Sequence, residues 1–155
     1  MMTGLMKASL TTLLILGSLL PGPLLNWFYN TIVVNHFKWS AGLFAQRINL
    51  SIVIATFAFT MLGFLAAIIT ILFSLTNTRT LRKYRKHNHL EIFFRFYYFS
   101  IVCLIFTFIL ALLGFGKEGS PGMFQLMITS AINNLTQISL IALVIINIAR
   151  KASEE

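Results

Sequence analysis

The sequence predicts an all-α integral membrane protein, a bundle of four transmembrane helices. Hydrophobic residues make up 57% of the 155 residues and charged residues only 10%, whereas a typical soluble domain has about 25% charged residues. The mean hydropathy of +0.84 agrees with this class. The apolar residues gather in four segments, and each approaches or exceeds the ~20 residues with which an α-helix crosses a bilayer. These segments are 3–20, 50–75, 92–115 and 123–149.

The distribution of Lys and Arg predicts how these spans are oriented within one transmembrane domain, residues 1–155. Basic residues collect in short loops on the cytoplasmic side of a membrane. With the N-terminus inside, the cytoplasmic set is Lys7, Arg79, Arg82, Lys83, Arg85, Lys86, Arg95, Arg150 and Lys151. The outer set is only Lys38, Arg47 and Lys117. We therefore expect a bacterial-type inner membrane, both termini in the cytoplasm, an outer loop over 21–48 and a basic cytoplasmic loop over 76–91.

The first span, 3–20, admits a second interpretation. Lys7 and the apolar run 8–20 also have the charged and apolar regions of a signal peptide. The stretch from Gly17 to Pro21 is a poor small-x-small cleavage site, so we expect an uncleaved span. Proline disrupts a helix, so the span is expected to break at Pro21 or to continue past a kink there toward Leu25.

The outer loop is rich in aromatic side chains: Trp27, Phe28, Tyr29, Phe37 and Trp39. Trp and Tyr favour the headgroup zone, where the ring is in an apolar environment and the polar atom stays in water. We expect this loop to lie along the outer interface, with a short helix that begins near a Ser40 cap.

Small and hydroxyl side chains form a stripe along each of the first three spans. On the second span they fall within an arc of roughly 80° at the helical period. Helices in lipid associate where small residues let their backbones approach. We therefore expect the stripes to turn inward and pack the bundle, with the lining of a polar path as the alternative. The stripes are Gly4, Ala8, Thr11 and Ser18; Asn49, Thr56, Thr60, Gly63, Ala67, Thr70 and Ser74; and Ser100, Cys103, Thr107, Ala111 and Gly114.

The fourth span has a different polar face, because it includes primary amides. Ser130, Asn133, Asn134 and Gln137 occupy one arc of about 100° between the outer half and the centre of the membrane. An amide that faced lipid without a partner would cost a few kcal/mol. These side chains must therefore meet other helices, a cavity or another protomer. Helix contact and the lining of a permeation path both remain open.

The sequence offers little for catalysis or metal binding. No Asp, Glu, Lys or His lies in the central part of a span, which disfavours a proton-coupled transporter. His87 and His89 have no Cys or carboxylate companions, so we expect neither a metal site nor a cofactor. No nucleophile with a base, carboxylate pair or phosphate-binding glycine loop is present, so we expect no enzyme. Cys103 is the only cysteine and cannot form an intramolecular disulfide.

The basic loop has two interpretations. Its cations are Arg79, Arg82, Lys83, Arg85 and Lys86. Each cation near anionic headgroups contributes ~1 kcal/mol of membrane attraction, and the same cluster would also suit an acidic cytoplasmic partner. We expect no nucleic acid. Glu91 and Arg95, four residues apart, predict a helical ion pair. Arg95 lies one turn inside the third span, and we expect its long side chain to extend to the cytoplasmic surface.

Three segments carry a resemblance to a known family. The second span contains the small-residue segment Gly63-Phe64-Leu65-Ala66-Ala67 and is followed by Thr78-Arg79-Thr80-Leu81-Arg82-Lys83. The third span is rich in aromatic residues, and the fourth ends in Asn147-Ile148-Ala149-Arg150-Lys151. This pattern, over about 50–115 and the tail, resembles the four-span inner-membrane subunit of the lambda-type phage exclusion (Rex) system. The resemblance implies an ion-permeable effector controlled by a cytoplasmic sensor, and it assigns no residue a role.

From the residues themselves we expect a non-enzymatic membrane protein that acts as an assembly or accessory component of a membrane complex. Its partners would be a bilayer with anionic headgroups and either further copies of itself or other subunits. The alternative is an ion channel or transporter-like pore, lined by the fourth-span amides and by the threonines of the second span.

Overall fold

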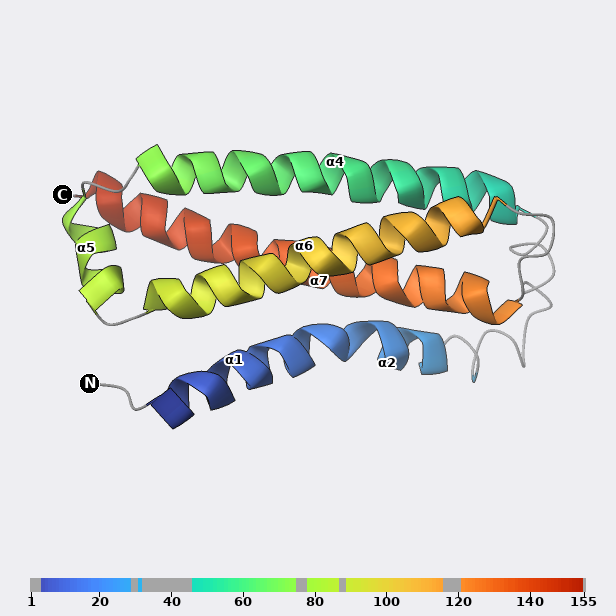
Figure 1. Cartoon of the computed structure of the whole chain (residues 1–155), viewed down its shortest axis with the longest axis horizontal. Helices are drawn as coiled ribbons and strands as arrows, with labels where there is room; N and C mark the ends of the chain where they lie inside the picture. The colour runs from blue at the N-terminus through green and yellow to red at the C-terminus, as the bar shows by residue number, and fades with distance from the viewer. Residues whose placement is uncertain are drawn as a thin grey trace.

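The computed structural model describes residues 4–28, 31, 46–74, 78–86, 89–115 and 121–154. Within these ranges the structure has helices and no strand, which confirms the all-α class for this part of the chain. Figure 1 labels the helices as α1 (Gly4–Leu19), α2 (Pro21–Phe28), α4 (Arg47–Ser74), α5 (Arg79–Lys86), α6 (His89–Leu113) and α7 (Pro121–Ser153).

Four helical segments are long and apolar enough to cross a membrane. They are Ser9–Phe28, Arg47–Ser74, Leu90–Leu113 and Gly122–Ser153. This confirms the four apolar helices expected from the sequence, and it moves their ends by a few residues. The largest shift is in the first segment, which extends through α2.

The first segment bends where α1 meets α2. Pro21 and Pro23 have no N–H, so two hydrogen bonds of a continuous helix cannot form there. The chain nevertheless stays helical beyond the bend, and the Leu24 N–H donates to the Leu20 carbonyl at 3.1 Å. Residues 21–28 of the expected outer loop are therefore helical, because a helix tolerates proline in its first turn. The expected helix near Ser40 lies outside the described residues.

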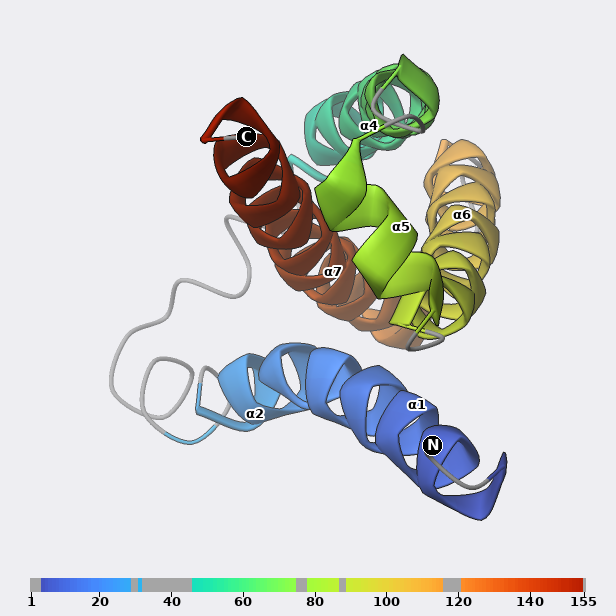
Figure 2. The ribbon, with the colours of Figure 1, turned by 90° about the vertical axis from the view of Figure 1, so that its left-hand side faces the viewer.

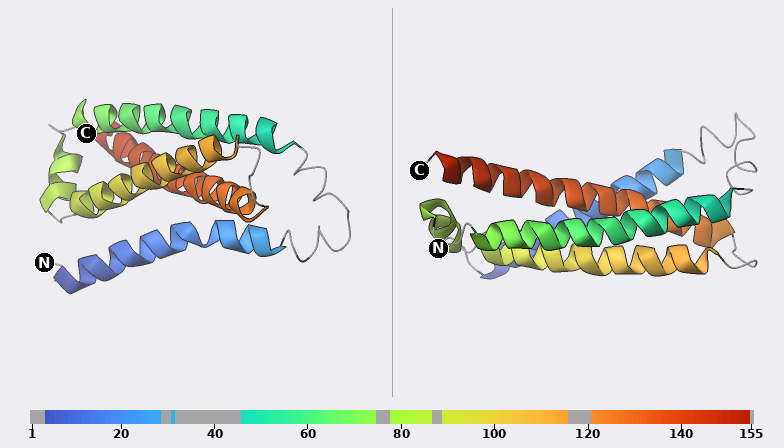
Figure 3. Two further views of the ribbon diagram at one scale, coloured as in Figure 1. Left: turned by 45° about the vertical axis from the view of Figure 1, so that its right-hand side comes forward. Right: turned by 90° about the horizontal axis from the view of Figure 1, so that it is seen from above.

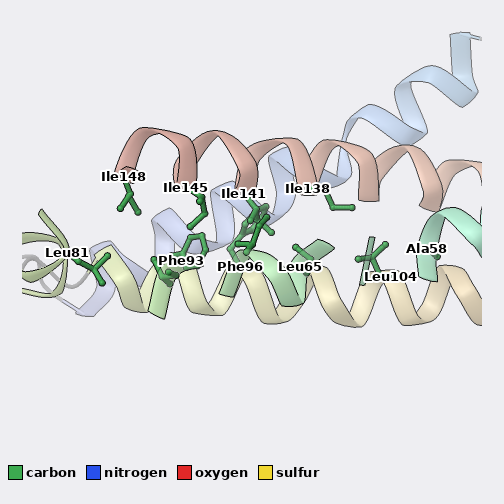
Figure 4. Close-up of a cluster of buried hydrophobic side chains, with 12 residues drawn as sticks. Ala58, Leu65, Leu81, Phe93, Phe96, Leu104, Ile138, Ile141, Ile145 and Ile148 are labelled. Carbon is green, nitrogen blue, oxygen red and sulfur yellow. The ribbon is translucent and has the colours of Figure 1, made fainter. Parts of the chain in front are cut away.

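α4, α6 and α7 pack around a hydrophobic core made of two clusters of buried side chains. α1 with α2 lies on the opposite side of α6 and α7 from α4 (Figures 1 and 2). Isoleucines of α7 at alternating spacings of three and four point toward α6 and α4 (Figure 4). This spacing keeps the side chains on one helical face. The labelled core residues are Ala58, Leu65, Leu81, Phe93, Phe96, Leu104, Ile138, Ile141, Ile145 and Ile148.

The segment predicted as a basic loop contains the helix α5. Thr78 caps it, since the Leu81 N–H donates to Thr78 Oγ1 at 3.3 Å. Leu81 is only 2% exposed and joins the core at the end of the bundle. A sequence with so many cations forms a helix here because one apolar side chain anchors it and the charged side chains remain exposed on the other sides.

One end of the bundle holds α5, the beginning of α1 and the end of α7 (Figure 1). The cations of α5 and the pair Arg150 and Lys151 of α7 therefore lie at this end, whereas Arg47 begins α4 at the opposite end. Arg95 Nη2 donates to Glu91 Oε1 at 2.6 Å, which confirms the predicted pair. Figure 3 shows the two termini at this end in two further views.

Candidate functional site

A buried polar cluster joins the middle of α6 to α7. Thr107 is fully buried, and its hydroxyl donates to the Cys103 carbonyl at 2.9 Å. Asn134 Nδ2 donates to Thr107 Oγ1 at 2.6 Å, and Ser130 Oγ bonds to the same oxygen. Because the Thr107 hydroxyl has a single proton, Ser130 is the donor in that contact. Thr107 therefore connects two side chains of α7 to the backbone of its own helix.

The neighbouring amide, Asn133, faces a different helix. Its Oδ1 accepts a 2.7 Å hydrogen bond from the backbone N–H of Gly22, at the start of α2. A Cβ atom at Gly22 would lie 2.5 Å from the Thr129 carbonyl oxygen. Only glycine permits this approach. Asn133 and Asn134 thus hold two different helices against α7.

Gln137 completes the amide cluster, and it is fully buried. Its Nε2 and Oε1 atoms, like Asn134 Oδ1, have no hydrogen-bond partner among the described residues. The Cys103 thiol lies beside the amide without satisfying it. A buried amide without hydrogen bonds costs free energy, so Gln137 is the polar side chain here that helix packing alone does not explain.

The stripe of small residues on α6 lies inward, as expected from the sequence. Ser100, Thr107 and Ala111 are fully buried, and Cys103 is partly buried. A Cβ atom at Gly114 would lie 2.5 Å from Ser51 Oγ of α4, so Gly114 also marks a close helix contact. On α1, Thr11 and Ser18 are buried too.

The corresponding stripe on α4 points the other way. Thr56, Thr60, Gly63, Ala67 and Thr70 are all exposed, together with Asn49 and Ser74. The expectation that this stripe turns inward is therefore wrong within the single chain. The side chains that α4 buries lie on the opposite face at 3.6 residues per turn. They are Ser51, Ile54, Ala55, Ala58, Leu65, Ile68 and Leu72.

The hydroxyls of this exposed stripe do not require an interhelical partner. Thr60 Oγ1 donates to the Thr56 carbonyl at 2.8 Å, and Thr70 Oγ1 donates to the Ala66 carbonyl at 3.0 Å. Such bonds to the preceding turn satisfy a hydroxyl within its own helix. The threonines of α4 and the amides of α7 consequently do not line one shared path inside the chain.

Two contacts of the bundle were not predicted from the sequence. One is the approach of Gly22 to α7, whose only sequence signal is a glycine between two prolines. The other joins α6 to α4, because the Tyr97 hydroxyl donates to the Leu65 carbonyl at 2.8 Å. No motif or spacing in the sequence pointed to this contact of Tyr97.

The predicted cations of the cytoplasmic side, Arg79, Arg82, Lys83, Arg85 and Lys86, are exposed on α5. In the described ranges no three side chains of His, Cys, Asp or Glu come together in a way that could hold a metal ion. The chain matches no protein-family model, no curated protein and no solved structure.

Proposed function

We propose that this chain is a non-enzymatic, multi-pass inner-membrane protein that functions by assembling with further copies of itself or with other subunits. The exposed stripe of α4 is the observation that carries this proposal. A small-residue face that points away from its own bundle packs against no other helix among the described residues. In lipid, such a face lets a second helix approach closely.

The same proposal includes insertion with both termini in the cytoplasm. It is supported by four helices of sufficient length and hydropathy, and by the cations at the α5 end of the bundle. Basic residues near the ends of spans remain preferentially on the cytoplasmic side.

The test of assembly uses Gly63→Leu. No neighbouring atom lies within 4 Å of a Cβ atom at Gly63, so a larger side chain leaves the isolated bundle undisturbed. We expect this variant, and Ala67→Leu, to dissociate the assembly in detergent, as measured by size-exclusion chromatography with light scattering and by recovery of co-purified subunits. Gly17→Leu is the matched control, because Gly17 is also exposed with open space around it.

The assignment of the interface to α4 is wrong if all three variants retain the assembly mass and the co-purified subunits of the unaltered protein. These variants are Gly63→Leu, Ala67→Leu and Gly17→Leu. Loss of assembly in Gly17→Leu alone would move the interface to α1. Circular dichroism must show the same helix content in all three variants.

A second candidate function, an ion or solute pore, is favoured by the unpartnered amide of Gln137 and agrees with the resemblance to a phage exclusion effector. Its test is flux from liposomes that contain the purified protein. The pore proposal expects flux that Gln137→Leu abolishes and that Asn147→Leu, an exposed amide on the same helix, preserves. Liposomes that stay tight with correctly folded protein would rule the pore out and leave assembly as the function.

A further inference from the structure

An apolar cavity of about 650 Å³ lies between α1, α6 and α7 at the end of the bundle that α5 covers. Figures 1 and 3 show α1 diverging from α6 and α7 toward this end. The walls are leucine, isoleucine, valine and phenylalanine side chains, including Leu14, Phe96 and Val144. Two side chains of α5, Lys83 and Tyr84, complete the lining.

The shape of this cavity suits one chain of a lipid. On α7 its lining extends from Leu140 to Ile148, a separation of eight residues that corresponds to about 12 Å along the helix. The hydrocarbon of one leaflet is about half of 30 Å thick, so the cavity covers most of the depth of a leaflet. Its volume also lies within the roughly 300–1,000 Å³ typical of small-molecule sites.

The charge at the α5 end determines which lipid fits best. Lys83 is the only charged residue of the lining, and the rest of α5 adds Arg79, Arg82, Arg85 and Lys86. Lysine binds phosphate as a point charge. An anionic headgroup gains from this surface, whereas the positive group of a zwitterionic headgroup does not.

We propose that this cavity is a binding site for an anionic phospholipid, with an acyl chain between α1, α6 and α7 and the phosphate beside Lys83. The site rests on the membrane insertion proposed above, but it does not depend on assembly through α4. It gives α5 a specific ligand and links the position of α1 to the composition of the surrounding leaflet.

The test is native mass spectrometry of the full-length protein, released from detergent, with phosphatidylglycerol or phosphatidylcholine added. We expect one bound phosphatidylglycerol with an affinity at least about tenfold above that of phosphatidylcholine. Val144→Trp fills the cavity and should abolish this binding. Val102→Trp is the matched control, because Val102 on α6 is exposed to a similar extent, 47% against 41% for Val144, and lies outside the cavity.

A second pair of variants tests the headgroup contact without altering the packing. Lys83→Gln should weaken phosphatidylglycerol binding about fivefold, as expected for one cation near an anionic lipid. Lys86→Gln, exposed on the same helix but outside the lining, should have little effect.

The proposal is overturned if the two lipids bind equally, or if Val144→Trp binds phosphatidylglycerol as Val102→Trp does. It is also overturned if Lys83→Gln and Lys86→Gln behave alike, which would assign α5 to general membrane attraction or to an acidic protein partner. Extraction of native membranes with alkaline carbonate checks insertion separately. Failure of the lipid site with the protein still inserted is therefore distinguishable from failure of the proposed function.

Discussion

The backbone N–H of Gly22 donates a 2.7 Å hydrogen bond to Oδ1 of Asn133, which joins the bend of the first segment to the middle of α7. At this bend Gly22 is flanked in sequence by Pro21 and Pro23, which have no N–H to donate. A side-chain amide of another helix thus satisfies a backbone group at the point where the regular helix is interrupted, and a buried backbone group requires such a partner.

Gly22→Ala is expected to destabilise the bundle. The added methyl group would lie 2.5 Å from the Thr129 carbonyl and 2.6 Å from Asn133 Oδ1, so the two helices must separate. Overpacking of this kind typically costs about 1–3 kcal/mol, and thermal unfolding in detergent micelles, followed by circular dichroism, measures it. Gly17→Ala is the control, since nothing lies within 4 Å there and alanine favours the helix by up to about 1 kcal/mol. Equal melting temperatures for both variants would contradict the close contact.

Tyr97→Phe is expected to weaken the contact between α6 and α4. It removes the 2.8 Å hydrogen bond to the Leu65 carbonyl and leaves the ring in place. Interhelical hydrogen bonds in membranes contribute about 0.6–1.7 kcal/mol each. Tyr98→Phe serves as the comparison, because Tyr98 is 70% exposed on the same helix. If both substitutions shift the unfolding free energy equally, Tyr97 has no special role in joining the helices.

The two central amides should respond in opposite directions to replacement by leucine. Asn134→Leu removes the hydrogen bond that Asn134 donates to the Thr107 hydroxyl, which then keeps only Ser130 as a donor. We expect the free energy of unfolding to fall by about 1–2 kcal/mol. Gln137→Leu removes two buried polar atoms that have no partner, and we expect a gain of about 1–3 kcal/mol. Chemical unfolding of both variants in micelles measures this difference. Destabilisation by Gln137→Leu would show that the amide binds something in the folded protein.

Neutralising the cations of α5 should disturb orientation before it disturbs folding. We expect the fourfold change Arg82→Gln, Lys83→Gln, Arg85→Gln and Lys86→Gln to leave helix content intact, since these side chains are exposed. In the proposed orientation these cations keep the α5 end in the cytoplasm, and their loss would reduce that bias. For the measurement, Cys103 is replaced and a single cysteine is introduced by Ser153→Cys. Labelling of this cysteine by a membrane-impermeant thiol reagent reports the side of the membrane on which the C-terminus lies. An unchanged labelling pattern would leave the orientation to other residues.

The stripes of small residues illustrate how far sequence pattern leads. On both α6 and α4 the pattern of Gly, Ala, Thr and Ser predicted that the stripe faces inward. The stripe of α6 does so, whereas the stripe of α4 is exposed. Ala55 and Ala58 of α4 are the small side chains that are buried instead, on the face that also holds Leu65 and Ile68. In a helix that is apolar on every side, periodicity identifies a stripe but not the direction in which it faces.

Hydropathy and charge along the chain were sufficient to predict the all-α class, the four long apolar helices and the Glu91–Arg95 pair. Each depends on hydropathy or charge along one stretch of chain, and neighbours four residues apart on a helix meet regardless of the fold. The tertiary structure decided which helix each amide faces, why Gly22 must be glycine and where a cavity lies beneath α5. These features depend on how helices that are distant in sequence are rotated and spaced relative to one another. Because the helices carry apolar side chains on all faces, the sequence pattern does not determine that rotation or spacing.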